Sequence, residues 1–249
     1  MVCGVRAPRD PRLAVHRASS AALEARSPLN PRIKALVFDF DGLILETETP
    51  AYQSWTEIYR EHGHELPRDR WLDYIGREAG WFDALTHLET LVGTPFDRDA
   101  VRRRREERKT MLMADLDVMA GIRDYISEGR RLGLRMGIAS SSPRSYVRTH
   151  LDRVGLAEGW DAIVCREDAP RAKPAPDLYL RAVELLGVAP GEALALEDSP
   201  NGIAAAKDAG LWVVAVPNDL TASGDLTRAD CRVSTCAELP LRELFARLG

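Results

Sequence analysis

Five short apolar runs, separated by longer amphipathic segments, set the pattern of the chain. They span residues 33–39, 134–139, 162–165, 193–197 and 212–216. A nearly continuous apolar run of this length is typical of a strand buried on both faces of a parallel sheet. We therefore predict five buried parallel strands.

The segments between the later runs carry apolar residues at spacings of three and four, which predicts helices over 145–154, 176–186 and 201–209. Each is followed by a glycine that is suited to end a helix, namely Gly155, Gly187 and Gly210. Strands that alternate with helices favour right-handed crossovers and an open sheet covered on both sides. The predicted fold is an α/β, Rossmann-like, doubly wound parallel sheet.

One segment breaks this alternation. Between about residues 47 and 115 there is no convincing buried strand, and the pattern predicts helices over 52–61, 81–91 and 97–113. A helical block that follows the first strand predicts an inserted α-helical cap domain over residues 47–114. The catalytic core would then comprise residues 31–46 and 115–249.

The third of these cap helices carries a run of charges that has two interpretations. Arginine occupies every position from 102 to 105, and Glu106, Glu107, Arg108 and Lys109 follow. The run could bind an anion, or it could be a solvated helix face of mixed charge. We favour the solvated face, because opposite charges three and four residues apart commonly stabilise exposed helices.

Residues 1–30 differ from the rest of the chain. They contain five arginines and only two acidic residues, and four prolines between residues 8 and 31 interrupt any long helix. No apolar stretch follows the arginines, so a secretory signal is not indicated. We predict a disordered extension or a start site placed too far upstream; an organelle transit peptide is the less favoured alternative.

Composition excludes several classes of function. The 249 residues include 34 basic and 38 acidic side chains, a net charge of −4, so no global basic field favours a nucleic-acid partner. No apolar run approaches the roughly 20 residues that span a membrane. The four cysteines have neither metal-site spacing nor the density of a secreted disulfide scaffold, and we expect a cytoplasmic location.

Polar residues capable of chemistry follow four of the predicted strands. They are Asp39 and Asp41 after the first, Ser140, Ser141 and Ser142 after the second, Lys173 after the third, and Glu197 and Asp198 after the fourth. Open α/β sheets bind ligands beyond the carboxyl ends of their strands, so these groups should converge on one edge. Acids, hydroxyls and a lysine together suit a phosphate held by Mg²⁺.

The ordered set resembles the motifs of the haloacid dehalogenase superfamily of phosphohydrolases, in the subclass with a helical cap after the first motif. The resemblance covers the chain from about residue 33 to its end. The matching segments are Asp39-Phe40-Asp41-Gly42 with the residues up to Glu48, Ala139-Ser140-Ser141-Ser142, Lys173-Pro174-Ala175-Pro176-Asp177, and Leu196-Glu197-Asp198-Ser199-Pro200-Asn201-Gly202.

The resemblance implies a role for each acidic residue. Asp39 would be the nucleophile and would form an aspartyl-phosphate, and Asp41 would act as general acid and then as general base. Mg²⁺ would be held by Asp39, the backbone carbonyl of Asp41, and Asp198. Glu197 would ligate the ion directly or lie just behind its ligands.

The resemblance also implies how the substrate is bound. The Ser140 hydroxyl and the Ser141 N–H would hold the transferring phosphoryl group, and Lys173 would neutralise its charge. Arg77, in the cap, would bind a second anion or sugar hydroxyls, although a simple surface arginine is an equally good interpretation. The partner is a small phosphorylated metabolite, and we expect a monomer or a weak homodimer.

The chain departs from the resemblance at Ala51. Relatives of the β-phosphoglucomutase type carry a histidine at this position of the cap, and alanine cannot transfer a proton. The prediction is therefore a Mg²⁺-dependent phosphatase of a small phosphorylated metabolite, such as a sugar phosphate. A β-phosphoglucomutase-like phosphomutase is the first alternative, and a non-catalytic phosphometabolite-binding module is the second.

Overall fold

The computed structural model describes residue 1 and residues 33–76 and 82–248. Within them the strands form one parallel sheet in the order β3-β2-β1-β4-β5-β6. The strands are β1 (Ala35–Phe38), β2 (Arg135–Ala139), β3 (Ala162–Val164), β4 (Ala193–Glu197), β5 (Trp212–Ala215) and β6 (Cys231–Arg232). The five predicted strands are confirmed; β6, at the sheet edge, was not predicted.

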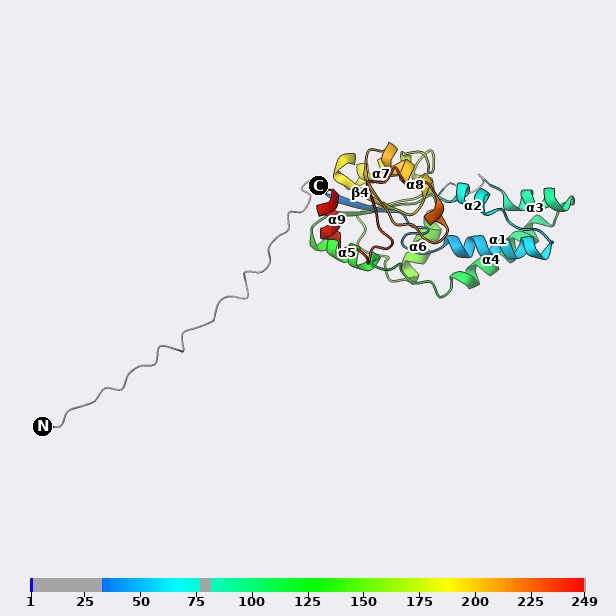
Figure 1. The fold of residues 1–249 in the computed structure, drawn as a ribbon, viewed down its shortest axis with the longest axis horizontal. Helices are drawn as coiled ribbons and strands as arrows, with labels where there is room; N and C mark the ends of the chain where they lie inside the picture. Colours follow the sequence, from blue (N-terminus) through cyan, green and yellow to red (C-terminus); the bar gives the residue numbers. More distant parts are fainter. Residues whose placement is uncertain (2–32, 77–81, 249) are drawn as a thin grey trace.

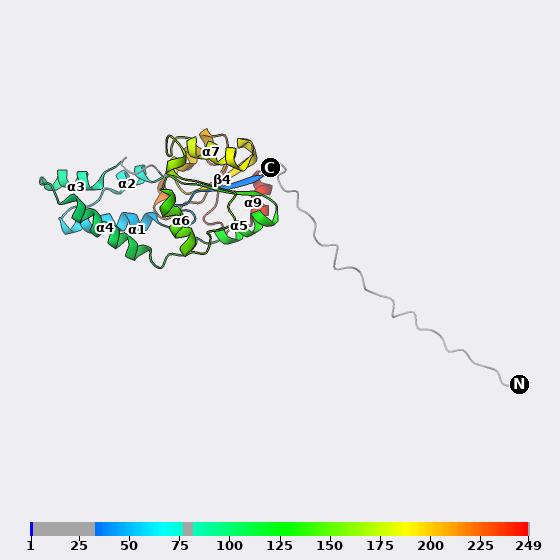
Figure 2. The same cartoon turned by 180° about the vertical axis from the view of Figure 1, so that it is seen from behind.

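Helices cover both faces of the sheet (Figures 1 and 2). One face packs against α7 (Asp177–Leu186) and α8 (Pro200–Asp208). The other packs against α5 (Ile122–Arg131), α6 (Arg144–Arg153) and α9 (Leu241–Leu248). Along β1, Ala35 and Val37 join the first core while Leu36 and Phe38 join the second, as the alternation of a strand requires. The predicted fold class is confirmed.

The ends of three helices follow the glycine pattern. Gly155, Gly187 and Gly210, just beyond α6, α7 and α8, have φ angles of 69°, 68° and 86°. Only glycine adopts this left-handed conformation without steric cost, so these positions stop each helix and turn the chain toward the next strand. Short 3-10 turns lie at Arg166–Asp168, Pro190–Glu192 and Thr221–Ser223.

Four helices form a separate group that we call the helical lobe, residues 48–113 (right-hand end of Figure 1). They are α1 (Glu48–Glu61), α2 (Arg68–Tyr74), α3 (Ala84–Val92) and α4 (Arg98–Met113). The side chains of Asp83 and Asp97 accept backbone N–H bonds at the starts of α3 and α4, which fixes where both helices begin. The lobe has its own apolar cluster around Tyr59 and Trp71. The short α2 was not predicted.

The predicted N-terminal extension and Arg77 lie outside the described residues. Among the helices that the structure describes, none has the length and apolarity that a membrane crossing needs.

Gly121, at the start of α5, lies against the C-terminal segment, and its substitution tests how closely that segment packs on the core. Its φ is 82°, and a Cβ atom there would lie 2.1 Å from the backbone nitrogen of Ala237. We expect Gly121→Ala to lower the free energy of unfolding in urea by about 2 kcal/mol more than Gly133→Ala, because overpacking adds to backbone strain.

Gly133 is the matched control, since its φ is 75° and open space surrounds the missing Cβ. Equal losses of stability in the two variants would contradict the packing.

Candidate active site

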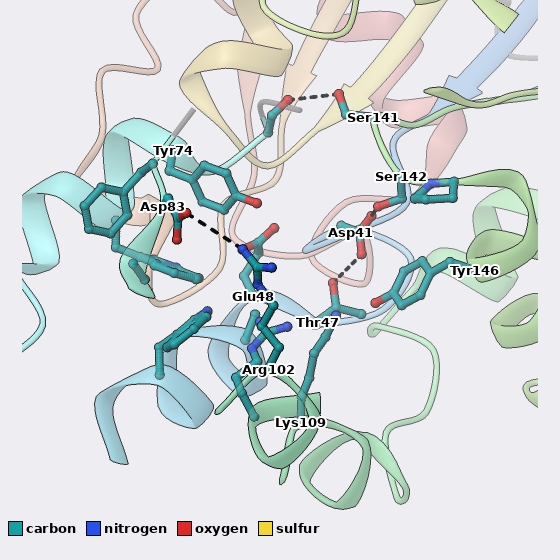
Figure 3. Close-up of a pocket in the computed structure, with 18 of the residues that line it drawn as sticks. Asp41, Thr47, Glu48, Tyr74, Asp83, Arg102, Lys109, Ser141, Ser142 and Tyr146 are labelled. Carbon is teal, nitrogen blue, oxygen red and sulfur yellow. Dashed lines mark hydrogen bonds and ion pairs between the residues drawn. The ribbon is translucent and has the colours of Figure 1, made fainter. Parts of the chain in front are cut away.

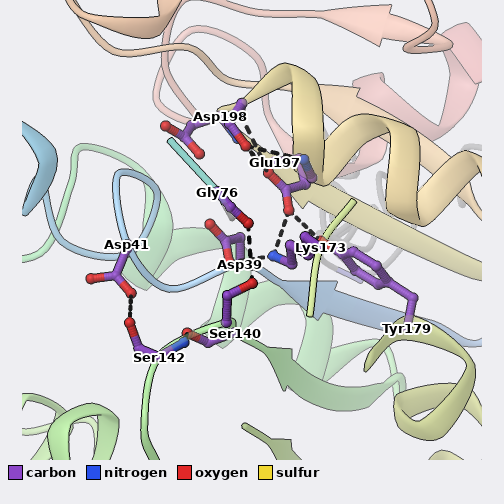
Figure 4. Close-up of polar contacts among 12 residues, drawn as sticks. Asp39, Asp41, Gly76, Ser140, Ser142, Lys173, Tyr179, Glu197 and Asp198 are labelled. Carbon is purple, nitrogen blue, oxygen red and sulfur yellow. Dashed lines mark hydrogen bonds and ion pairs between the residues drawn. The ribbon is translucent and has the colours of Figure 1, made fainter. Parts of the chain in front are cut away.

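The carboxyl ends of β1 and β4 bring three acidic side chains together (Figure 4). Asp39 follows β1, Glu197 ends β4, and Asp198 follows it. Each offers a carboxylate oxygen within 4.8 Å of the others, and all three side chains are buried. The convergence predicted from the strand ends is present.

Lys173 compensates part of this negative charge. Its Nζ lies 2.5 Å from Oδ1 of Asp39 and 2.6 Å from Oε1 of Glu197, and it is completely buried. Burial disfavours the charged ammonium, but the two carboxylates more than offset that effect and raise the pKa of Lys173. Lys173 is therefore a permanent cation between the two strand ends.

Glu197 is fully occupied by protein donors. Its Oε1 accepts hydrogen bonds from Lys173 and from the hydroxyl of Tyr179 at 2.7 Å. Its Oε2 accepts from the backbone N–H of Asp198 at 3.1 Å and from the backbone N–H and hydroxyl of Ser199, both at 3.4 Å. Gly202 leaves room for this carboxylate, since a Cβ there would lie 1.9 Å from Oε1.

Asp198 differs from Glu197 because one of its oxygens is unused. Oδ2 accepts a bond of 2.8 Å from the side-chain amide of Asn218, whereas the buried Oδ1 has no hydrogen-bond partner among the described residues. Burial, followed by the charges of Glu197 and Asp39, raises the pKa of Asp198 well above its usual value. A buried, unpartnered carboxylate oxygen beside Asp39 is a donor set that suits a hard divalent cation such as Mg²⁺.

The pKa of Asp39 is also displaced. Burial and the charge of Glu197 raise it from 3.8 to about 8, against the opposing effect of Lys173. The folded protein therefore holds the proton of Asp39 more tightly than the unfolded chain does.

Asp41 lies between two hydroxyl groups. Oγ1 of Thr47 donates to its Oδ1 at 2.7 Å, and Oγ of Ser142 donates to its Oδ2 at 2.6 Å. Both bonds satisfy a carboxylate and hold it in one orientation at the cavity wall (Figures 3 and 4).

The serine loop after β2 connects the sheet with the helical lobe. Ser140 is buried, and its Oγ accepts the backbone N–H of Ser142 at 3.0 Å. The hydroxyl of Ser141 donates to the backbone carbonyl of Gly76 in the lobe at 3.1 Å. The loop next to Asp39 is thus in direct contact with the lobe.

A cavity of about 540 Å³ lies between the lobe and the sheet edge (Figure 3). That volume suits a small metabolite. Asp39 and Asp41 line it from the sheet side, and Ala51, not a histidine, lines it from α1. Its further lining includes aromatic side chains and a set of charges from the lobe: Trp55, Trp71, Tyr74, Phe82, Tyr146, Glu48, Asp83, Arg102, Arg105 and Lys109.

The interpretation of the α4 charge run as a solvated face is therefore only partly right. It holds for Arg104 and Arg108, which pair with Glu61 and Glu57 at the surface. It does not describe Arg105 and Lys109, which are half-buried and line the cavity; the exposed Arg102 lines the cavity as well. The sequence pattern shows a helix, but not which of its faces meets the sheet edge.

Several residues of the site were missed from sequence. Asn218 follows β5, so the same strand-end argument would have found it. Thr47 and Glu48 lie in the first motif segment but were assigned no role, and Tyr179 gave no local signal because only the packing of α7 brings it to the sheet edge.

Comparisons with known proteins identify the family. Residues 33–210 match the haloacid dehalogenase-like hydrolases. YhcW of Bacillus subtilis, named as a candidate phosphatase, is 41% identical over 217 residues, which cover 87% of this chain and 98% of the relative. Hexitol phosphatase B of Escherichia coli is 28% identical and covers 86% and 97%.

A solved structure agrees with this match. CbbY from Rhodobacter sphaeroides, in complex with xylulose 1,5-bisphosphate, is 29% identical with a TM-score of 0.66, over 83% of this chain and 96% of that chain. The α/β fold and the sequence matches define a hydrolase. The protein belongs to the haloacid dehalogenase-like hydrolase family, as the motifs indicated.

The raised pKa of Asp39 leads to a prediction about stability without metal. In EDTA, we expect wild type to lose stability relative to Asp39→Asn as the pH rises from about 4 to about 8. Over this range the unfolded carboxyl group is ionised, whereas the folded one retains its proton. Urea unfolding of both proteins at a series of pH values measures the difference.

Mg²⁺ should remove this pH dependence, because a cation beside Asp39 favours its ionised form. A difference between the two proteins that does not change with pH would contradict the assigned environment of Asp39.

Proposed function

We propose that this hydrolase is a Mg²⁺-dependent phosphatase that acts on a small phosphorylated metabolite through an aspartyl-phosphate on Asp39. The observation that carries the proposal is the buried pair of Asp39 and Lys173 beside the unpartnered oxygen of Asp198.

In the first step, a carboxylate oxygen of Asp39 attacks phosphorus and the bond to the leaving oxygen breaks. Asp41 donates the proton that the leaving oxygen takes up. In the second step, water attacks the aspartyl-phosphate, Asp41 accepts its proton, and Asp39 is regenerated. The Ser140 hydroxyl and the Ser141 N–H hold the phosphoryl oxygens, and Lys173 compensates their charge.

Asp39, the backbone carbonyl of Asp41, and Asp198 would hold the metal, which when bound supplies positive charge to the phosphoryl oxygens. Of the two roles open to Glu197, we assign it the place just behind the metal ligands, where it positions Lys173, since both of its oxygens already accept hydrogen bonds from protein groups. The binding of a second anion or of sugar hydroxyls by Arg77 stays a prediction.

Two relatives suggest the kind of substrate. One is named a hexitol phosphatase, and the CbbY structure holds a sugar bisphosphate. We therefore infer a sugar phosphate or a similar metabolite. In this proposal residues 47–114 act as a cap over a core of residues 31–46 and 115–249. A cytoplasmic location and a monomeric or weakly dimeric state stay predictions.

Ala51 favours hydrolysis over isomerisation. It lines the cavity where a mutase of the β-phosphoglucomutase type would carry a histidine for proton transfer. A phosphomutase would need a sugar bisphosphate activator and would release no net phosphate, and a binding module would show neither reaction.

With Mg²⁺ and a panel of sugar phosphates, we expect net release of phosphate without any bisphosphate activator. Asp39→Asn should lower kcat by at least about 1,000-fold, because it removes the nucleophile. Asp41→Asn should lower it by about 100-fold or more, because it removes the proton donor.

Asp117→Asn is the matched control, since this exposed carboxylate pairs with Arg123 at the surface. Phosphate release by Asp39→Asn at the wild-type rate would refute the assignment. Isomerised product without net phosphate would instead identify a mutase.

A further inference from the structure

Three cations on α4 share one face. Arg102, Arg105 and Lys109 are three and four residues apart, which places them in one row along the helix. All three line the cavity that Asp39 lines from the opposite side. Figure 3 shows Arg102 and Lys109 extending from α4 into this space.

Two cations on another face of α4, Arg104 and Arg108, are already paired. Arg108 forms two hydrogen bonds with Glu57, at 2.6 and 2.8 Å, and Arg104 pairs with Glu61. At the start of the helix, Arg98 pairs with Asp83 and Glu89 at 2.7 and 2.8 Å. These pairs stabilise the lobe and leave little capacity for a ligand.

The cations that face the cavity are satisfied less well. Arg102 reaches Asp83 only at 4.0 Å, and Asp83 already accepts bonds from Arg98 and from the backbone of α3. Arg105 pairs with the exposed Glu106, while its buried Nε has no partner among the described residues.

Lys109 forms no ion pair with any residue that the structure describes, and its Nζ lies 4.8 Å from the ring centre of Tyr146. Trp55 likewise lies under Arg105, at 5.6 Å. Aromatic faces orient both cations without neutralising them.

The acidic residues of the lobe that line the cavity are fewer than these three cations. Glu48 also lines the cavity, and burial, followed by the charge of Asp41, raises its pKa to about 8 against the effect of Lys109. The other lobe acid among the described lining residues, Asp83, is paired with Arg98, so the three cations face at most one carboxylate without a cation of its own. The lobe side of the cavity therefore carries surplus positive charge.

We propose that Arg102, Arg105 and Lys109 form a second anion site, so that the substrate carries a phosphate or carboxylate group in addition to the scissile phosphate. This proposal rests on the proposed function, because the scissile phosphate occupies the sheet-edge end of the same cavity. Arg105 and Lys109 contact the second anion, and Arg102 stands at the exposed end of the row.

The test compares probes that differ only in the second anion. Glucose 1,6-bisphosphate against glucose 1-phosphate tests a second phosphate, and 3-phosphoglycerate against glycerol 3-phosphate tests a carboxylate. We expect kcat/KM to be at least about 10-fold higher for the doubly anionic member of one pair, the scale of a charge-assisted hydrogen bond.

Arg105→Gln and Lys109→Gln should each reduce that ratio by about 10-fold, and Arg105→Lys should retain most of it. Arg104→Gln, on the opposite face of the same helix with the same loss of charge, should leave the ratio unchanged. Equal kcat/KM values within both pairs, or an effect of Arg104→Gln equal to that of Arg105→Gln, would overturn the second site.

A binding measurement keeps this test separate from the proposed function. Calorimetry with Asp39→Asn compares the affinity for glucose 1,6-bisphosphate before and after Arg105→Gln is added. A loss of about 10-fold supports the anion site even if no probe is hydrolysed, and no loss overturns it. Absence of phosphate release from every probe would refute the proposed function alone.

Discussion

The buried ammonium of Lys173 is the interaction on which the arrangement of the site depends. It lies within 2.6 Å of both Asp39 and Glu197, whose strands are neighbours in the sheet. Two buried carboxylates without a cation would repel each other and lose their hydration. Removal of one member of a buried charged group leaves the others unpaired, which costs far more than loss of a surface pair. The ends of β1 and β4 and the loop after β3 are thereby held together.

One lysine does not balance three buried acids. Asp198 keeps an oxygen without a partner, and its pKa is raised together with that of Asp39. Two glycines make this crowding possible: a Cβ on Gly42 would lie 2.4 Å from Oδ2 of Asp198, and one on Gly202 would enter the carboxylate of Glu197. Because Gly42 and Gly202 have no side chain, the carboxylates of Asp198 and Glu197 can lie directly against the backbone. The repulsion in that geometry is relieved by protons kept on Asp39 and Asp198 or by a bound cation.

Much of this arrangement can be predicted from the sequence, because the signals that define it lie within short segments of the chain. Central strands are continuous apolar runs, and groups at their carboxyl ends must share an edge, so Asp39, Ser140, Lys173 and Asp198 were found without a structure. The two-residue β6 carries too little pattern to detect.

Contacts that depend on tertiary packing could not be predicted from the sequence pattern. Thr47 reaches Asp41 from the start of α1, and Tyr179 reaches Glu197 from α7. The periodicity of α4 identified a helix with a charged surface, but its orientation depends on how α1 and α4 pack, which no short pattern encodes. The charge run was only partly understood because the sequence does not show which face of α4 is turned toward the cavity.

The helical lobe and the sheet edge contribute different chemical groups to the cavity. The sheet edge gathers acids, a lysine and a serine loop, which suit a phosphoryl group, whereas α4 presents its row of cations to the same cavity from the lobe. The lobe and the sheet edge are in direct contact through hydrogen bonds. The hydroxyl of Ser141 donates to the backbone carbonyl of Gly76. The side-chain amide of Asn201, on α8, donates to the backbone carbonyls of Asp73 and Ile75. These three hydrogen bonds join the lobe to the ends of β2 and β4, where the serine loop and Asp198 lie.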